Sequence, residues 1–250
     1  IYHFRLDEEA LWFDKLTERR DGESDVQPQR ICSPLHVTAI TCDSHDGSYG
    51  RLLEWHTTTG QLRRWAMPMA MLSGNGEELR RILLENGLTY ISTRPALRSL
   101  LCEYISRSLP GRRVACVEKT GWHNGVYVLP DEVIGPGGSN VILQGSHYLT
   151  GGFAQSGTLA EWQEQVAALC AGNSRLIFAV CCALAAPLLR LTGTGGGGFH
   201  LRGESTDGKT TVMKVAASVC GGTDYWHSWR ATGNALEGIA SRHNDALLPL

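Results

Sequence analysis

Residues 198–222 read GFHLRGESTDGKTTVMKVAASVCGG, and this stretch decides which fold the sequence predicts. Within it, residues 203–211 match the pattern G-x-x-x-x-G-K-[ST]. The backbone N–H groups of such a loop surround a β-phosphate, so glycine stands where a side chain would collide with it. The pattern therefore predicts a nucleotide-binding loop, and its residues are Gly203, Glu204, Ser205, Thr206, Asp207, Gly208, Lys209, Thr210 and Thr211.

The side chains of the loop predict ATP and Mg²⁺ as cofactors. Lys209 would supply positive charge to the β- and γ-phosphates, and the Thr210 hydroxyl would ligate Mg²⁺. The helix that follows would aim its positive N-terminus at the same anion. Asp207 would cost little if its carboxylate pointed to solvent, but it would repel the nucleotide if it pointed inward. We therefore expect Asp207→Ser to leave nucleotide binding equal or tighter.

The surroundings of the loop predict an α/β fold with a P-loop NTPase core of the AAA+ or RecA type. Residues 198–202 are short and apolar enough for the strand before the loop, and residues 211–220 repeat apolar side chains at helical spacing. Gly221 and Gly222 would end that helix. We expect a parallel sheet in which residues 245–250 lie beside the first strand and residues 225–231 lie outside.

The acidic residue that a P-loop NTPase uses to hold Mg²⁺ and orient water is not found at the end of a second strand. Residues 225–231 carry no suitable carboxylate, and Asp245 stands at the beginning of the apolar run DALLPL rather than at its tip. We therefore expect this ATPase domain to be truncated at the Walker B strand. The 250-residue chain alone is expected to hydrolyse almost no ATP. If it did turn over ATP, Asp224, Glu237 and Asp245 would be the alternative metal ligands.

The sequence predicts three regions: a charged segment and linker over residues 1–30, a smaller α+β domain over residues 31–150, and the P-loop ATPase domain over residues 151–250. The helices are expected at residues 8–16, 76–86, 95–108 and 158–171, and after a break at Asn173 and Ser174 an apolar helix is expected to about Leu191. The strands of the middle region are expected at residues 35–42, 51–56, 61–67, 114–117, 121–129 and 140–144.

Composition excludes several classes of protein. The 250 residues are 42% apolar and 19% charged, with a net charge of −2, so a disordered chain and a strongly basic one are excluded. The apolar run at residues 176–189 is shorter than the roughly 20 residues that a membrane span needs, so no membrane partner is expected. The eight cysteines form no C-x-x-C pair and predict reduced thiols and a cytoplasmic protein.

The chain resembles the domain-of-unknown-function 927 family over about residues 30–250. The resemblance rests on segments such as CSPLHVTAITCD, TGWHNGVYVLP, LCAGNSRLIFAVCCALAAPLL, GGFHLRGESTDGKTT and WRATGNALEGIASRHNDALLPL. It implies a mobile-element protein with a helicase or primase–helicase ATPase, often joined to a primase-like module. It assigns no role to the matching positions Arg230, Asn234, Glu237, His243 and Asn244. For Arg230 and His243, packing and a place near a phosphate or a neighbouring subunit are the two interpretations.

Three functions are compatible with these features. The first is the ATP-binding portion of an ATP-dependent DNA helicase or primase–helicase, which would act on DNA as a homo-oligomeric ring because an arginine is supplied by the neighbouring subunit. The second is a P-loop ATPase that switches or remodels protein without unwinding. The third is a nucleotide- or DNA-binding module with no turnover.

Overall fold

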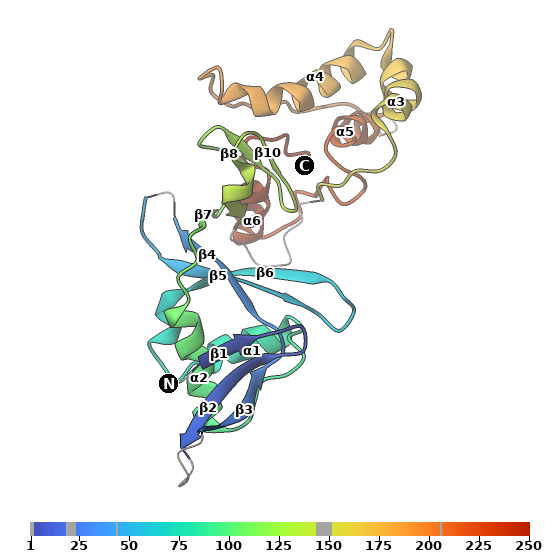
Figure 1. Ribbon diagram of the computed structural model, residues 1–250. Helices are drawn as coiled ribbons and strands as arrows, with labels where there is room; N and C mark the ends of the chain where they lie inside the picture. The colour runs from blue at the N-terminus through green and yellow to red at the C-terminus, as the bar shows by residue number, and fades with distance from the viewer. Residues whose placement is uncertain (1–2, 19–23, 44, 144–151, 206) are drawn as a thin grey trace. The chain divides into compact units, whose positions relative to one another are not determined.

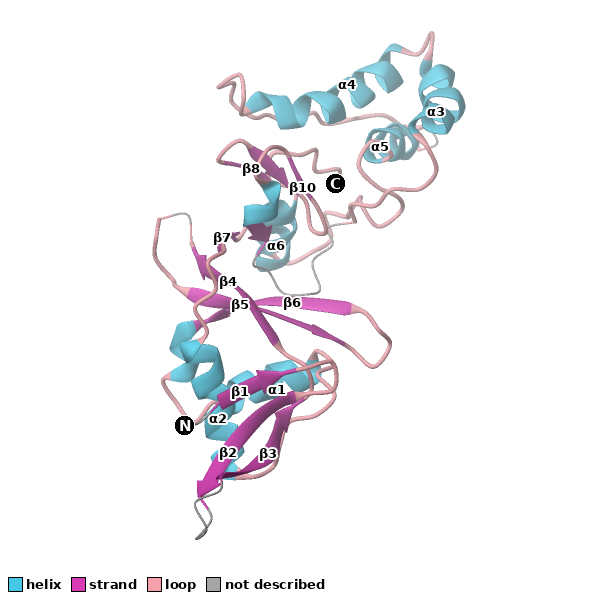
Figure 2. Cartoon of the chain, in the orientation of Figure 1, coloured by secondary structure: helices cyan, strands magenta, loops and turns pink. Residues whose placement is uncertain are grey.

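The computed structural model describes residues 3–18, 24–43, 45–143, 152–205 and 207–250 (Figure 1). The chain divides into two compact units, Ile1–Cys116 and Val117–Leu250. It is a mixed α/β protein in which several small sheets alternate with helices (Figure 2). The domain boundary predicted at residues 150 and 151 lies outside the described residues.

The first unit begins with an antiparallel sheet of β1 (His3–Leu6), β2 (Leu11–Glu18) and β3 (Ser24–Cys32). The helix predicted over residues 8–16 and the linker after it are therefore wrong. Leu11 and Phe13 are buried and Trp12 between them is less so, and this alternation is the period of a strand. The alternation is hidden in the sequence because Leu11, Trp12 and Phe13 are all apolar, and because the exposed Lys15 falls on the face of Leu11 and Phe13.

Four strands of a second sheet follow the order β7, β4, β5, β6, and they confirm four predicted strands. Its members are β4 (His36–Cys42), β5 (Gly50–His56), β6 (Leu62–Pro68) and β7 (Arg113–Val117). The β4–β5 and β5–β6 pairs are antiparallel, whereas β7 runs parallel to β4. A parallel pair needs a long crossover. Here the connection from β6 to β7 contains a 3-10 turn (Met69–Leu72) and the two predicted helices, α1 (Glu77–Glu85) and α2 (Pro95–Arg107).

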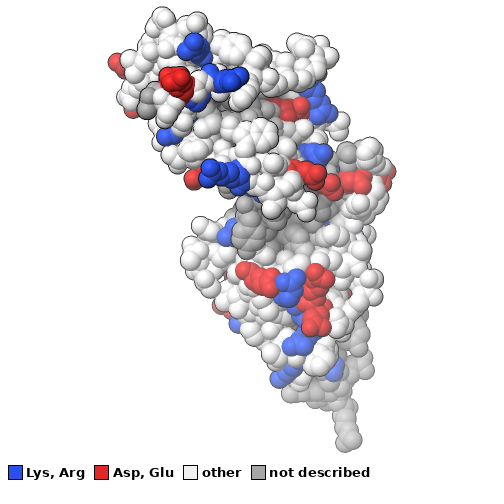
Figure 3. Space-filling model, turned by 180° about the vertical axis from the view of Figure 1, so that it is seen from behind, with Lys and Arg blue, Asp and Glu red and all other residues white. Residues whose placement is uncertain are grey.

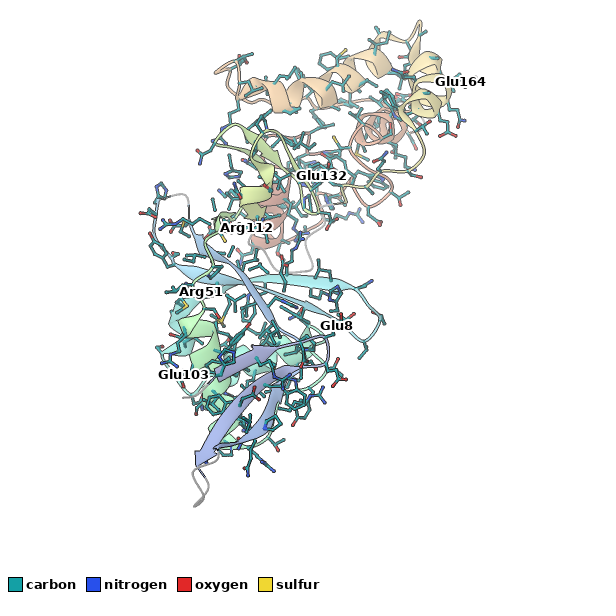
Figure 4. The ribbon with its side chains drawn as sticks, in the orientation of Figure 1. Glu8, Arg51, Glu103, Arg112, Glu132 and Glu164 are labelled. Atoms are coloured by element: carbon teal, nitrogen blue, oxygen red, sulfur yellow. The ribbon has the colours of Figure 1, made fainter. Side chains whose placement is uncertain are left out.

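The core of the first unit is formed by these helices and strands together. Leu53 and Trp55 of β5 are fully buried with Leu83 of α1 and Leu101 of α2. The Trp55 indole N–H donates to the backbone carbonyl of Asn86 at 3.1 Å, so its one polar atom is satisfied. Arg51, labelled in Figure 4, is also buried, and its guanidinium donates to the carbonyl oxygens of Ser108 and Gly50.

The second unit begins with an antiparallel meander of β8 (Gly121–His123), β9 (Val126–Val128) and β10 (Val133–Ile134), followed by a 3-10 turn (Gly138–Asn140) and β11 (Val141–Leu143). The single strand predicted over residues 121–129 is wrong because a hairpin turn divides it. Asn124 and Gly125 have φ angles of 49° and 84°, as a two-residue turn of type I′ requires.

The helices of the second unit are α3 (Leu159–Trp162), α4 (Ser174–Leu189), α5 (Lys209–Ala217) and α6 (Gly233–Arg242), with π and 3-10 turns at Gln163–Ala167 and Ala168–Cys170. The predicted capping box is confirmed: Thr158 and Glu161 exchange hydrogen bonds at the start of α3. Within the described ranges, no helix is long and apolar enough to span a membrane.

The strands predicted at residues 198–202, 225–231 and 245–250 are absent, and residues 152–205 and 207–250 contain only an isolated bridge between Phe153 and Gly221. A strand needs ladder partners, and in the described chain no backbone hydrogen bond joins residues 198–202 to another segment. Residues 225–227 and 247–249 do lie together. His227 N donates to the Pro249 carbonyl at 3.0 Å, and Tyr225 Oη donates to the Leu247 carbonyl at 2.6 Å. These two segments, which the sequence predicts as strands of one sheet, are therefore adjacent but do not form a β-ladder.

Candidate functional site

The glycine-rich loop leads directly into a helix. Residues 203–205 and Asp207 form an exposed turn, and Thr206 lies outside the described residues. Gly208 is the N-cap of α5 with a φ of 76°, which favours glycine, and a Cβ added there would meet open space. Lys209, Thr210 and Thr211 form the first turn of α5, which has no side-chain cap. The predicted helix after the loop is therefore confirmed, beginning two residues earlier than expected.

Two charged side chains fold back onto the beginning of the loop. The Lys209 ammonium donates to the carbonyl oxygen of Gly203 at 2.8 Å and also to that of Glu204. Asp207 Oδ2 accepts a hydrogen bond of 2.7 Å from the Glu204 backbone N–H. The loop thus brings a cation, an anion and the start of a helix together within six residues of sequence.

The helix that carries the loop is held by small residues. Ala216 and Ala217 of α5 are buried, as are Ala179 and Ala183 of α4, which packs on α5. On α5, Lys214 lies over the Trp226 ring at 5.6 Å from the ring centroid. The C-terminal half of α5 is therefore packed against its surroundings, whereas Thr210 and Thr211 of its first turn are exposed.

The candidate metal ligands lie apart from one another. Thr210 is exposed on the first turn of α5, and Asp224 and Glu237 are exposed elsewhere. In the part of the chain that the structure describes, no group of three or more His, Cys, Asp or Glu side chains could hold a metal ion. The role of Thr210 as an Mg²⁺ ligand therefore stays a prediction from the sequence.

Asp245 has a structural environment that sequence reasoning missed. Its Oδ2 accepts hydrogen bonds from the Trp122 backbone N–H at 2.9 Å, from Arg190 Nη1 at 3.1 Å and from Asn244 Nδ2 at 3.2 Å. The Asp245 side chain is 15% exposed, and its backbone φ is 54°. Asp245 therefore joins the β8 hairpin to the end of α4 through its Oδ2. No local pattern connects Trp122 with Asp245, because they are more than a hundred residues apart.

His243 is buried and forms part of an aromatic cluster with Phe153, Tyr225 and His227. Its ring centroid lies 4.9 Å from that of Tyr225 and 5.3 Å from that of His227. His243 Nδ1 is 2.9 Å from the Ile239 carbonyl, and its Nε2 has no protein partner in the described chain. Burial lowers the pKa of His243 and that of His227, and Arg242 lowers both further. Packing is therefore the interpretation that the structure supports for His243, whereas Arg230 is exposed.

These histidines predict that the second unit loses stability in mild acid. A histidine whose pKa is lowered in the folded state does not change the stability at a pH where it is neutral in both the folded and the unfolded chain. As the pH falls below about 6.5, the unfolded chain takes up protons that the folded chain does not, so unfolding becomes easier. We expect urea midpoints to fall between pH 8 and pH 5, and a smaller fall for a His227→Asn, His243→Asn double variant. An equal fall in both proteins would contradict this assignment.

Charges are mixed on the surface rather than gathered by sign. On the face shown in Figure 3, Lys and Arg side chains lie among Asp and Glu side chains in both units. This agrees with the net charge of −2. A nucleic-acid partner would consequently need a local contact rather than an extended basic track.

Comparison with known proteins identifies the family. The model of the family described as "Domain of unknown function (DUF927)" matches residues 4–250. The chain belongs to this family. A search of the curated proteins finds no significant match. Among solved structures, the DUF927 chain is similar to one described as "SCCmec type IV Cch - active helicase", with a TM-score of 0.67 and 20% sequence identity. The similarity covers 94% of this chain and 45% of the other, so the chain spans less than half the length of that structure.

Proposed function

We propose that this chain is the ATP-binding portion of an ATP-dependent DNA helicase or primase–helicase of a mobile element. The observation that carries the proposal is the loop at residues 203–211, which leads into the uncapped N-terminus of α5 with the Lys209 ammonium held at its opening. Membership of the family and the similarity to a solved structure described as a helicase support the same proposal. Fold similarity alone would not assign an activity, so the loop provides the chemical argument.

The residues of the loop fit a nucleotide. Gly208 leaves open space where a side chain would stand, and as the N-cap of α5 it makes no side-chain cap hydrogen bond in the part of the loop that the structure describes. A helix beginning in this way attracts anions through its partial positive charge. Lys209 would bind the phosphates as a point charge, and Thr210 would orient Mg²⁺ through one neutral oxygen. The bound metal would neutralise phosphate charge and polarise the bond to the leaving group.

The proposed partners are DNA and further copies of the protein. In a ring, a subunit would supply an arginine to the phosphates held by its neighbour, and hydrolysis would then be coupled to movement along DNA. A cytoplasmic location is part of the same proposal.

The test is phosphate release from Mg-ATP by the whole protein, measured with and without DNA. We expect DNA to raise the rate and Lys209→Ala to remove it. Turnover that DNA leaves unchanged would instead favour an ATPase that switches or remodels protein. Nucleotide binding without turnover under either condition would favour a binding module.

A further inference from the structure

The loop at residues 203–211 contains its own anion. Asp207 Oδ2 accepts from the Glu204 N–H at 2.7 Å, and it lies 2.6 Å from the point that a Cβ on Gly203 would occupy. The Asp207 carboxylate therefore lies directly over the beginning of the loop, in space that the glycine leaves open. It does not point away into solvent.

The loop's cation is directed inward as well. Lys209 Nζ donates to the carbonyl oxygens of Gly203 and Glu204, the same two residues that Asp207 covers. The side chains of Asp207 and Lys209 are thus both used in contacts within the loop. A backbone N–H and an ammonium are the donors that such a loop offers to phosphate oxygens.

We infer that the Asp207 carboxylate is an internal competitor of the nucleotide phosphates and sets the affinity of the loop for them. The inference rests on the proposed function. For a phosphate to enter, the carboxylate must leave the Glu204 N–H, because two anions at hydrogen-bond distance from the same donors repel each other strongly. Lys209 must also release the loop carbonyls. Asp207 therefore lowers the affinity of the loop for phosphates.

Loss of the Asp207 charge should tighten binding. Asp207→Ala removes both the charge and the acceptor, whereas Asp207→Asn keeps an acceptor oxygen and removes only the charge. We expect the Asp207→Ala variant to lower the dissociation constant for Mg-ATP by about three- to tenfold, with a smaller gain for Asp207→Asn. Inorganic pyrophosphate should show the same order, because the competition concerns phosphate and not the base.

The experiment is calorimetric titration of wild type and these two variants with Mg-ATP and with pyrophosphate. Glu164→Gln is the matched control, since it removes one negative charge from an exposed position elsewhere in the same unit (Figure 4). Lys209→Ala tests whether the titrated site is the loop. Amide exchange at Glu204 in the free protein gives a second measurement, and it should be faster in the Asp207→Ala variant.

The outcomes separate the inference from the proposed function. Tighter binding in both Asp207 variants, unchanged binding in Glu164→Gln and loss in Lys209→Ala support the inference. Binding that Lys209→Ala removes but Asp207→Ala leaves unchanged or weakens contradicts the inference and keeps the proposed function. An equal gain in Glu164→Gln also contradicts it, because the effect would then be one of net charge. Absence of binding in every protein contradicts both.

Discussion

Replacement of Lys209 by alanine is expected to abolish measurable binding of Mg-ATP. Lys209 is the one cation within the loop, and its ammonium already lies against Gly203 and Glu204 at the entrance. Hydrogen bonds to charged groups contribute about 1.5–3 kcal/mol, so losing this contact weakens binding by about tenfold to more than a hundredfold.

Lys214→Ala provides the control for that experiment. Lys214 lies on the same helix, over the Trp226 ring, and its removal changes the net charge by the same amount. Calorimetric titration of the three proteins should show binding in wild type and Lys214→Ala only. Equal affinity in wild type and Lys209→Ala would mean that residues 203–211 do not hold phosphate.

Gly121→Ala is expected to destabilise the second unit strongly. Gly121 has a φ of 94°, and a Cβ there would lie 2.6 Å from Asp245 Oδ2 and 2.7 Å from the Asn244 carbonyl oxygen. The second contact is with backbone, which cannot turn aside as a side chain can. Strain at a positive φ and overpacking each cost about 1–3 kcal/mol, so we expect a loss of about 2–5 kcal/mol in the free energy of unfolding.

Gly125→Ala separates the two causes. Gly125 lies in the same hairpin with a φ of 84°, but a Cβ there meets nothing within 4 Å. It should therefore cost only the backbone strain, about 1 kcal/mol. Urea unfolding of both variants measures the difference, and equal losses would show that the contact with residues 244–245 contributes little.

Much of the local structure could be predicted from the sequence. Apolar periodicity predicts the strands β4 to β7 and the helices α1, α2, α4 and α5. The capping box of Thr158 and Glu161 correctly predicts where α3 begins. These features depend on residues a few positions apart, which is the range over which a pattern can be read.

The predictions of secondary structure were wrong where contacts between residues far apart in the sequence determine the structure. β2 appeared helical because its three consecutive apolar residues conceal the alternation of a strand, and only pairing with β1 and β3 makes it a strand. Residues 199–202, between the run of glycines and Gly203, have the composition of a strand. A strand requires hydrogen-bonded partners, and the described chain does not supply them. The predicted parallel sheet is consequently not observed.

In the candidate site, too, some features could be predicted from the sequence and others could not. The pattern of glycines, Lys209 and Thr210 predicted a loop followed by a helix, and that helix is present, whereas the nucleotide chemistry of the loop stays a prediction. The position of the Asp207 carboxylate could not be predicted, because sequence alone allowed it to point either way. The contacts of Asp245 with Trp122 and Arg190 could not be predicted from the sequence either, since they join segments far apart in the chain.

The most direct test of a phosphate site at residues 203–211 is a crystal structure of the protein with a non-hydrolysable Mg-ATP analogue. We expect phosphates against the backbone N–H groups at the start of α5, with Lys209 Nζ turned from the Gly203 carbonyl to the phosphates and Asp207 displaced from the Glu204 N–H. A nucleotide bound elsewhere, with the loop unchanged and Asp207 still on Glu204, would contradict this expectation.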